Sequence, residues 1–244
     1  MIEFLNTIDT QVFLFFNNTV RIPALDNFMM IFSGKFVWIP MYASLLYLIV
    51  RSFSPRQALI YVLGIALAVA LADQTCSSVI RPLAERLRPS NLGNPLSALT
   101  IVVNDYRGGA YGFPSCHAAN SFALAAFTSL LMHRRRFTLF IFGWAAFNSF
   151  TRIHLGVHYP GDLLVGAVIG SAFGWIVYRM ARALDVRRNA DLSVRLSRPL
   201  LHIPVRIQIT DTISLRTATV CVADIMTATC AATIVGILIA SFMI

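Results

Sequence analysis

The sequence has few charged residues and almost no lysine. Of its 244 residues, 13% are charged and 57% are hydrophobic, whereas a soluble domain usually has about 25% charged and about 45–50% apolar residues. This shortage of charge argues against a soluble domain and indicates a polytopic membrane protein. Lys35 is the only lysine, beside 19 arginines. The net charge of +9 would suggest nucleic acid as the partner of a soluble protein, but the apolar bulk argues against that partner here.

Paired cysteines and a basic N-terminal region are also lacking. The four cysteines include no Cys-X-X-Cys pair, so neither a zinc site nor a disulfide framework is indicated. No basic residue precedes the first apolar segment, so we expect no cleavable signal peptide. Instead, one helical face is shared by Leu5, Ile8, Val12, Phe15 and Phe16. This pattern predicts an amphipathic N-terminal helix that lies at the membrane interface.

Long apolar stretches are present, and they predict a single all-α domain over residues 1–244, a polytopic transmembrane bundle of about six spans. The five stronger spans cover about 28–50, 57–80, 116–132, 137–153 and 162–181, and a weaker sixth covers about 225–244. The third and fourth spans are short, because a span usually needs about 20 residues. The segment 185–244 is expected to be a cytoplasmic segment followed by the last span.

The connections between the spans differ in charge. Most arginines lie in the loop with Arg51 and Arg56, in HRRR at 133–136, and in the stretch 179–216. The positive-inside rule places these connections in the cytoplasm. The long connection 82–115 then lies on the opposite side, and its Pro and Gly content predicts an ordered cap over the membrane surface.

Three short motifs place chemically active residues on that opposite side. They are RPLAERLRP at 81–89, PSCH at 114–117 and TRIHLGVHYPGD at 151–162. Arg81 and Arg88 are seven residues apart, which is about two helical turns, so they share a face if the helix continues. The second motif begins an apolar span, where free backbone N–H groups and the helix dipole favour an anion.

The residue types in these motifs suit a phosphoryl group. A tetrahedral dianion would be bound by three guanidinium groups, by a serine hydroxyl and by the helix N-terminus. The residues concerned are Arg81, Arg88, Arg152 and Ser115. A single arginine at a span end is usually a snorkelling anchor, but the combination with two nearby histidines favours an anion site.

The same motifs supply residues for proton transfer and nucleophilic attack. His158 and His117 provide a nucleophile and a general acid, and no metal-ligand set is needed. Asp162 follows His158 by four residues, which is well spaced to fix the imidazole tautomer and to stabilise its developing positive charge. Pro160 is expected in the first turn of the last strong span, which leaves His158 just outside that helix. His154 remains a competing nucleophile.

In this order, the three motifs resemble the type 2 phosphatidic acid phosphatase (PAP2) family, lipid phosphatases related to vanadium haloperoxidases. The pattern of that family is K-x6-R-P, P-S-G-H and S-R-x5-H-x3-D, and the resemblance covers a core of about residues 8–182. Arg81 stands in place of Lys, Thr151 in place of Ser, and Cys116 in place of Gly. None of these departures changes the charge of the site, although Gly would permit a closer backbone approach to phosphate.

The resemblance implies a role for each motif. His158 would be the nucleophile that forms a phosphohistidine, Asp162 would orient it, and His117 would protonate the leaving oxygen and then activate water. The phosphoryl oxygens would be held by Arg81, Arg88, Ser115 and Arg152. The resemblance implies no metal and no other cofactor.

The resemblance to bacterial members also implies a substrate class and a location. The chain would hydrolyse a phosphomonoester or terminal diphosphate of a lipid, with undecaprenyl diphosphate or a lipid A phosphate favoured. Its partners would be that substrate and membrane lipids, and its site would face the periplasm from the bacterial inner membrane. The alternatives are a phosphatidylglycerol phosphate phosphatase, a lipid phosphotransferase and a membrane anion transporter.

Two residues beside the second motif have open roles. Cys116 lies at a helix start near arginines, where a thiol is activated, but cysteine phosphatases use C-x5-R and the sixth residue after Cys116 is Phe122. We therefore interpret Cys116 as a substrate-contact position and not as the nucleophile. Asn120, one turn later, is a further candidate for substrate contact.

Two other features allow a structural or a functional interpretation. Asp73 falls within an apolar span, where a carboxylate is often functional, although near the outer end it could simply pair with an arginine. Glu85 and Arg86 could form a surface ion pair in the cap.

Overall fold

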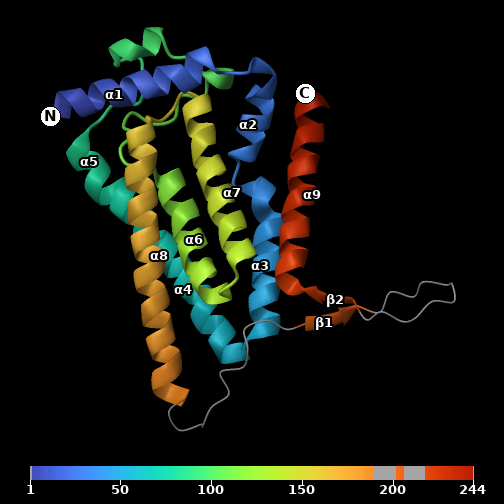
Figure 1. Cartoon of the computed structure of the whole chain (residues 1–244). Coiled ribbons are helices and arrows are strands. Elements are labelled where there is room, and N and C mark those ends of the chain that lie inside the picture. The colour runs from blue at the N-terminus through green and yellow to red at the C-terminus, as the bar shows by residue number, and fades with distance from the viewer. Residues whose placement is uncertain (1, 190–201, 206–217, 244) are drawn as a thin grey trace.

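The computed structural model describes residues 2–189, 202–205 and 218–243, and most of its helices run side by side (Figure 1). The helices are α1 (Ile2–Leu14), α2 (Asp26–Phe32), α3 (Ile39–Ser52), α4 (Pro55–Gln74), α5 (Arg81–Ala84), α6 (Cys116–Met132), α7 (Arg135–His154), α8 (Pro160–Asn189) and α9 (Val222–Met243). Two short strands, β1 (His202–Val205) and β2 (Ala218–Cys221), pair antiparallel. Apart from this hairpin, the all-α prediction is confirmed.

The number of membrane-crossing helices is confirmed only in part. Among the described residues, two helical stretches are long and apolar enough to cross a membrane, Pro55–Ala84 and Pro160–Asp185. A bent pair of helices between residues 23 and 52 would make a third. Each predicted span corresponds to helix, but α6 and the apolar part of α9 are shorter than a full span, and α7 carries arginines at both ends.

The predicted span at 28–50 is not a single straight helix, because the helix breaks at residues 33–35 and bends by 66°. Trp38 bridges the break by donating its indole N–H to the carbonyl oxygen of Phe32 at 2.9 Å. The Phe32 and Trp38 rings also pack edge to face, with centroids 4.6 Å apart. Gly34 lies within the break, where glycine commonly ends a helix. These contacts fix the backbone around Ser33.

Small residues let α6 and α8 approach closely. Gly166, Gly170 and Gly174 recur every four residues on one face of α8. A Cβ added at any of them would overlap backbone carbonyl oxygens of α6. Such small-residue stripes permit close helix packing where lipid surrounds the bundle. At the upper end of this contact, Gly166 lies against Ser115, so the packing places the second motif next to the start of α8.

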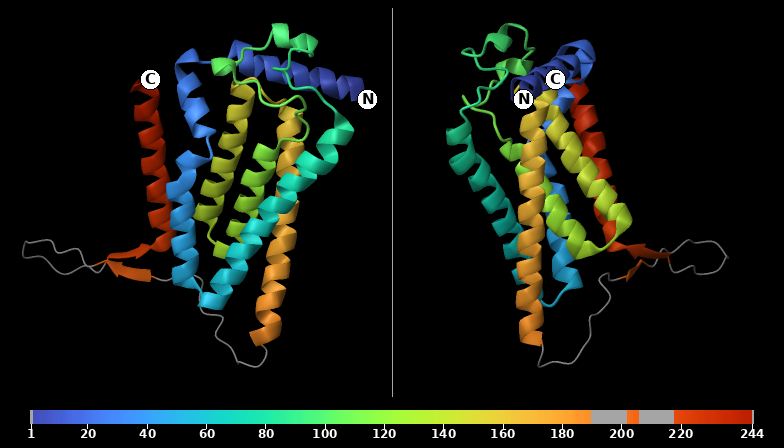
Figure 2. Two further views of the ribbon diagram at one scale, coloured as in Figure 1. Left: turned by 180° about the vertical axis from the view of Figure 1, so that it is seen from behind. Right: turned by 60° about the vertical axis from the view of Figure 1, so that its left-hand side comes forward.

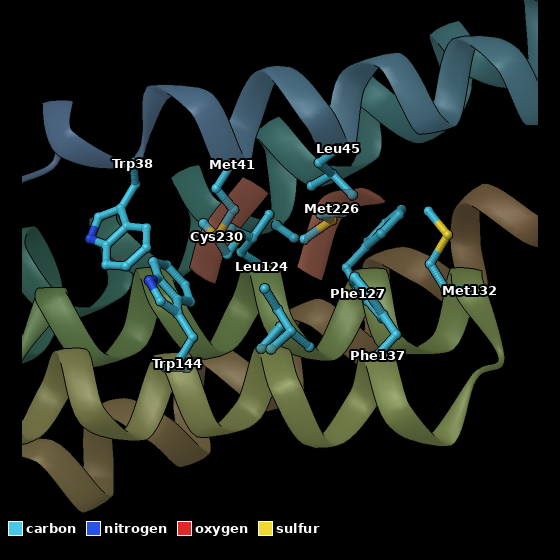
Figure 3. Packing of buried hydrophobic residues seen from close by; sticks show 14 of the residues in the cluster. Trp38, Met41, Leu45, Leu124, Phe127, Met132, Phe137, Trp144, Met226 and Cys230 are labelled. Atoms are coloured by element: carbon cyan, nitrogen blue, oxygen red, sulfur yellow. The ribbon is translucent and has the colours of Figure 1, made fainter. Parts of the chain in front are cut away.

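Buried hydrophobic side chains from α3, α6, α7 and α9 pack against one another between these helices (Figure 3). Met41 of α3 and Phe137 of α7 are almost fully buried. Met226 is 1% exposed and Cys230 is 0% exposed, so α9 packs as part of the bundle.

The two ends of the bundle carry different elements (Figures 1 and 2). Helix α1 lies across one end, beside the connection 85–115, which forms the predicted ordered cap. Asn17 ties the cap down by exchanging hydrogen bonds with Ile101, at 3.0 Å and 2.8 Å. The loops with Arg51 and Arg56 and with the HRRR run lie at the other end, so these two basic connections share one side of the bundle. Residues 190–201 and 206–217 lie outside the described part, so most of the expected cytoplasmic segment has no structural account.

Helix α1 exposes part of the apolar face that the sequence predicts. Leu5, Ile8 and Val12 are 57%, 41% and 36% exposed. On another face, Phe13 is buried, with its ring 5.4 Å from that of Tyr159. One side of α1 therefore packs on the bundle, while apolar side chains remain exposed on its surface.

Candidate active site

His158 and Asp162 lie side by side where α7 is followed by α8. Gly156 has a φ of +80°, which lets the chain turn sharply after α7, and Pro160 begins α8 as predicted. Nδ1 of His158 lies 3.2 Å from Oδ2 of Asp162, and both side chains are buried. The spacing seen in the sequence therefore produces a buried imidazole–carboxylate pair.

The other ring nitrogen of His158 faces an arginine. Nη1 of Arg88 lies 2.8 Å from Nε2 of His158. Because a guanidinium can only donate, Nε2 is the unprotonated nitrogen and Nδ1 carries its proton toward Asp162. Burial, followed by the charges of Arg88, Arg152 and Arg81, holds the pKa of His158 well below its usual range. His158 is therefore neutral near pH 7, with a lone pair on Nε2.

The three predicted arginines gather near this imidazole without a carboxylate of their own. Arg81 donates to the carbonyl oxygen of Pro114 at 3.0 Å, and Arg152 donates to Oγ of Ser33 at 2.9 Å. Within the part of the chain that the structure describes, none of the three forms a salt bridge, and the Nε of each is buried without a hydrogen-bond partner. Burial and the charges of Arg81 and Arg152 lower the pKa of Arg88 to about 10. Such a concentration of positive charge favours an anion.

The second motif is tied to both of the others. Ser115 caps the first turn of α6 with its side chain, and its backbone N–H donates to the carbonyl oxygen of Asp162 at 3.0 Å. Nε2 of His117 lies 2.9 Å from the carbonyl oxygen of Ser33, the residue whose hydroxyl accepts from Arg152. The structure therefore brings the residues of all three motifs together.

A cavity of about 500 Å³ adjoins this cluster. His117 and Ser33 line it, together with Asn120 and other polar side chains. Most of its remaining lining is apolar and comes from α3, α4, α6 and α7, and it includes four residues labelled in Figure 3: Trp38, Leu45, Leu124 and Trp144. The cluster of cations thus borders a space suited to an apolar group.

The three motifs are those of a known family. The model of the PAP2 superfamily matches residues 57–185, more than half of the chain and all three motifs. The chain belongs to the PAP2 superfamily.

Two curated relatives of this PAP2 protein are lipid A 4'-phosphatases. A lipid A 4'-phosphatase of Bacteroides thetaiotaomicron is 53% identical over 194 residues, which cover 80% of this chain and 86% of that protein. A lipid A 4'-phosphatase of Porphyromonas gingivalis is 33% identical over 178 residues, covering 73% and 75%. A transmembrane PAP2 type phosphatidylglycerolphosphate phosphatase from Bacillus subtilis has a similar fold, with a TM-score of 0.51, 17% identity and coverage of 80% of this chain and 89% of that one. The expected class, a membrane lipid phosphatase, is confirmed.

Ser33 is a residue of the PAP2 site that the motifs do not include. It accepts a hydrogen bond from Arg152 through its hydroxyl and from His117 through its carbonyl group. The signal for it in the sequence is the S-G-K interruption of an otherwise apolar stretch. An interruption of this kind indicates a helix break, but not which distant side chains meet there.

Arg86 is a second residue of the site for which the sequence predicted no role there. The predicted surface ion pair between Glu85 and Arg86 is wrong. Glu85 adopts a left-handed backbone conformation, with φ 45°, and is exposed where α5 ends. The chain turns there, and Arg86 reaches the carboxylate of the His158–Asp162 pair. Its Nη1 lies 2.9 Å from Oδ1 of Asp162, and its Nη2 lies 2.7 Å from Oδ2 of Asp9. The carboxylate behind His158 therefore has a counter-charge that sequence spacing alone could not identify.

The competing nucleophile, His154, has different surroundings. Its Nε2 lies 2.8 Å from Oδ1 of Asp26, and Asp26 also pairs with Arg21. This group joins α7 to the start of α2, and the structure gives no support to the alternative in which His154 attacks phosphorus.

The remaining candidates lie between α4 and α6. The Cys116 thiol accepts from Nη2 of Arg81 at 2.9 Å. Asp73 does not pair with an arginine among the described residues; it accepts from the side-chain amide of Asn120 at 2.8 Å. The interpretation of Asp73 as an arginine partner is therefore wrong. Asn120 lines the cavity beside His117, which is compatible with the substrate contact expected of it.

Proposed function

We propose that this PAP2 protein removes the 4'-phosphate of lipid A. The proposal of phosphoryl transfer rests on one observation above all: His158 has Asp162 behind one ring nitrogen and Arg88 in front of the other. Arg88 belongs to a cluster of three arginines that form no salt bridge with the described residues. The proposed substrate is supported by the two relatives that are named lipid A 4'-phosphatases.

The proposed reaction has two steps. Nε2 of His158 attacks phosphorus, the bond between phosphorus and the sugar oxygen breaks, and His117 gives its proton to that oxygen. The oxygen of a water molecule then attacks the phosphorus of the phosphohistidine while His117 takes a proton from the water. The bond between phosphorus and Nε2 breaks, its electron pair returns to Nε2 of His158, and inorganic phosphate is released. Asp162 stabilises the positive charge that develops on His158 during attack.

The arginines and the helix N-terminus would act on the phosphoryl oxygens. Arg81, Arg88 and Arg152 neutralise the charge of the dianion, and Ser115 with the first backbone N–H groups of α6 completes the oxyanion contacts. A dianion held beside His117 favours the protonated imidazole that the leaving oxygen requires. Cys116 and Asn120 are proposed to contact the substrate at the edge of this site.

The cavity supports a lipid as the leaving group. It lies next to His117, and most of its walls are apolar. A leaving alcohol that is protonated by His117 could extend an acyl chain into this space. A water-soluble phosphate ester has no apolar group that could fill this cavity.

The arrangement of the elements supports a periplasmic site. We propose six crossings, made by the bent pair α2–α3 and by α4, α6, α7, α8 and α9. The basic connections at the end opposite the site would face the cytoplasm of the bacterial inner membrane. The active site would then open at the outer surface of that membrane, where the lipid headgroups lie.

The decisive experiment offers purified protein bis-phosphorylated lipid A in detergent and with a metal chelator. Mass spectrometry of the product distinguishes loss of the 1-phosphate from loss of the 4'-phosphate. We expect 4'-dephosphorylated lipid A from the wild type and none from His158→Ala. Loss of the 1-phosphate instead, or full activity of His158→Ala, would contradict the proposal.

A substrate panel tests the alternatives. Undecaprenyl diphosphate, phosphatidylglycerol phosphate and lipid A are compared by release of inorganic phosphate. A higher kcat/KM on either of the first two would replace the proposed substrate, and transfer of phosphate to a second lipid without release would indicate a phosphotransferase. Phosphate hydrolysis of any of these lipids would argue against a transporter.

A further inference from the structure

The two oxygens of Asp162 have different partners. Oδ2 contacts His158 Nδ1 at 3.2 Å and accepts from the backbone N–H of Tyr159 at 3.1 Å. Oδ1 accepts from Arg86 Nη1 at 2.9 Å. The orientation of the carboxylate toward His158 thus depends on a contact made with its other oxygen.

The position of Arg86 is set from two further sides. Its guanidinium group lies over the ring of Tyr159, 4.0 Å from the centroid. Its second terminal nitrogen donates to Oδ2 of Asp9 at 2.7 Å. A planar guanidinium that donates to two carboxylates and stacks on a ring has little freedom. Arg86 is therefore well placed to hold Asp162 in one orientation.

Asp9 connects this arrangement to α1. Its Oδ1 accepts from the backbone N–H of Gly161, in the first turn of α8, at 2.7 Å. The contact is so close that a Cβ at Gly161 would lie 2.7 Å from Oδ2 of Asp9. One carboxylate of α1 thereby holds both Arg86 and the helix turn that carries Asp162.

We propose that Arg86 and Asp9 are positioning residues for the proposed phosphatase reaction, and that α1 is for this reason part of the catalytic apparatus. The inference rests on the proposed function, since it concerns the carboxylate behind the proposed nucleophile. Arg86 supplies the counter-charge that a buried carboxylate needs, and Asp9 fixes Arg86 against the start of α8. Neither residue contacts the phosphoryl group.

This arrangement predicts which kinetic constant changes. Arg81, Arg88 and Arg152 hold the phosphate in the proposed reaction, and their hydrogen bonds go to residues other than Arg86 and Asp9. We therefore expect substrate binding to be unaffected by changes at those two residues. Attack by His158 depends on Asp162, so the chemical step slows. A loss in kcat with an unchanged KM is the expected signature of an interaction made only in the transition state.

The molecule provides a matched control in the Arg21–Asp26 pair, which also joins partly buried side chains at this end of the bundle. Arg86→Gln is compared with Arg21→Gln, and Asp9→Asn with Asp26→Asn, by steady-state kinetics on lipid A and by melting temperature in detergent. We expect Arg86→Gln to lower kcat by about 10- to 100-fold, the size of effect seen when partners that orient the ligands of a metal site are removed. Asp9→Asn has a smaller effect, and the two controls keep kcat near the wild-type value.

Rescue separates positioning from folding. Arg86→Lys keeps a positive charge near Asp162 and restores part of kcat. Gly161→Ala displaces the Asp9 carboxylate and lowers kcat as Asp9→Asn does. If Arg86→Gln fails to fold, Arg86→Lys, Asp9→Asn and Gly161→Ala still test the proposal through the ratio of kcat to KM effects.

Several results would overturn the inference. One is equal loss of kcat in Arg86→Gln and Arg21→Gln, and another is a raised KM with unchanged kcat. A third is wild-type kinetics in both Asp9→Asn and Gly161→Ala. These results differ from failure of the proposed function, in which the wild type itself would release no phosphate from the lipid or His158→Ala would stay active.

Discussion

Two histidines four residues apart, His154 and His158, each belong to a histidine–aspartate–arginine group. His154 bonds Asp26, which pairs with Arg21. His158 bonds one carboxylate oxygen of Asp162, and the other oxygen of Asp162 pairs with Arg86. Both imidazoles are almost completely buried, at 3% exposure each. Neither burial nor a carboxylate partner therefore distinguishes a reactive histidine from one that joins two helices.

The difference lies in what surrounds the group. Nε2 of His158 points to Arg88, which with Arg81 and Arg152 forms a cluster of positive charge without carboxylate partners among the described residues. The Nε2 of His154 is used to bind its aspartate. A histidine becomes a candidate nucleophile when its carboxylate occupies one nitrogen and a phosphate site faces the other.

The largest difference in activity is expected between the alanine variants of the two histidines. His158→Ala should lower phosphate release by about 10⁴-fold or more, the scale seen when a nucleophilic unit is removed. His154→Ala should keep most of the activity, because its ring bonds Asp26 and takes no part in proton or phosphoryl transfer in the proposed reaction. Trapping of an acid-labile phosphoenzyme provides a second measurement, and its presence in His158→Ala would contradict the assignment.

The next effect concerns the two aspartates. Asp162→Asn should lower kcat by about 10²- to 10⁴-fold, because His158 loses the group that fixes its tautomer. Asp26→Asn should keep kcat but lower the free energy of unfolding by about 1–3 kcal/mol, the cost of leaving a buried partner unsatisfied. Kinetics and detergent melting curves of both variants test this, and the reverse pattern would move the catalytic role from His158 to His154.

The pH dependence of activity and stability should also reflect the surroundings of His158. The pKa of His158 is held below its usual range by burial and by the arginines, so the neutral nucleophile persists as pH falls below about 6.5. The stability contributed by the neutral form is present above that pH and is lost as pH falls toward the pKa of the folded state, because the unfolded chain binds the proton more readily.

The measurement is the acid limb of kcat/KM against pH in the wild type and in Arg88→Gln. Removal of one of the charges that depress the pKa should move the limb to higher pH. The ionisation of the phosphate ester, near pH 6, affects both proteins equally and cancels in the comparison. A limb that stays in place would show that Arg88 does not act on His158.

The smallest effect is expected at Cys116. Cys116→Gly should keep activity close to the wild type, because the proposed nucleophile is His158, whereas the thiol accepts a hydrogen bond from Arg81 and lies 3.9 Å from the carbonyl oxygen of Asp73. The variant should also lose sensitivity to thiol-modifying reagents. Inactivity as complete as that of His158→Ala would reverse the two assignments.

Local patterns in the sequence were enough to predict much of this protein. Apolar stretches marked the helices, and Pro160 before Asp162 marked the start of α8 with His158 just outside it. These features depend on residues close in the chain, so spacing could predict them. The same holds for the His158–Asp162 pair, since four residues span a single helical turn.

The points where helices bend or end, and the partners that are distant in the chain, could not be predicted in this way. The bend at Ser33 depends on Trp38 packing back onto Phe32, and Arg86 meets Asp9 across more than seventy residues of chain. The S-G-K interruption gave a hint of the bend, but the charged pair in the cap looked like an ordinary surface ion pair.

The sequence by itself therefore determined the membrane class, the family and a set of candidate residues for the chemistry, because each of these depends on composition or on motifs with fixed spacing. Only the tertiary structure decided which histidine faces the arginines, which arginine neutralises Asp162, and that α1 reaches the site through Asp9. The physical reason is that side-chain direction and burial are set by how helices pack. Two His–Asp pairs of the same composition can therefore be told apart only by what the fold places around them.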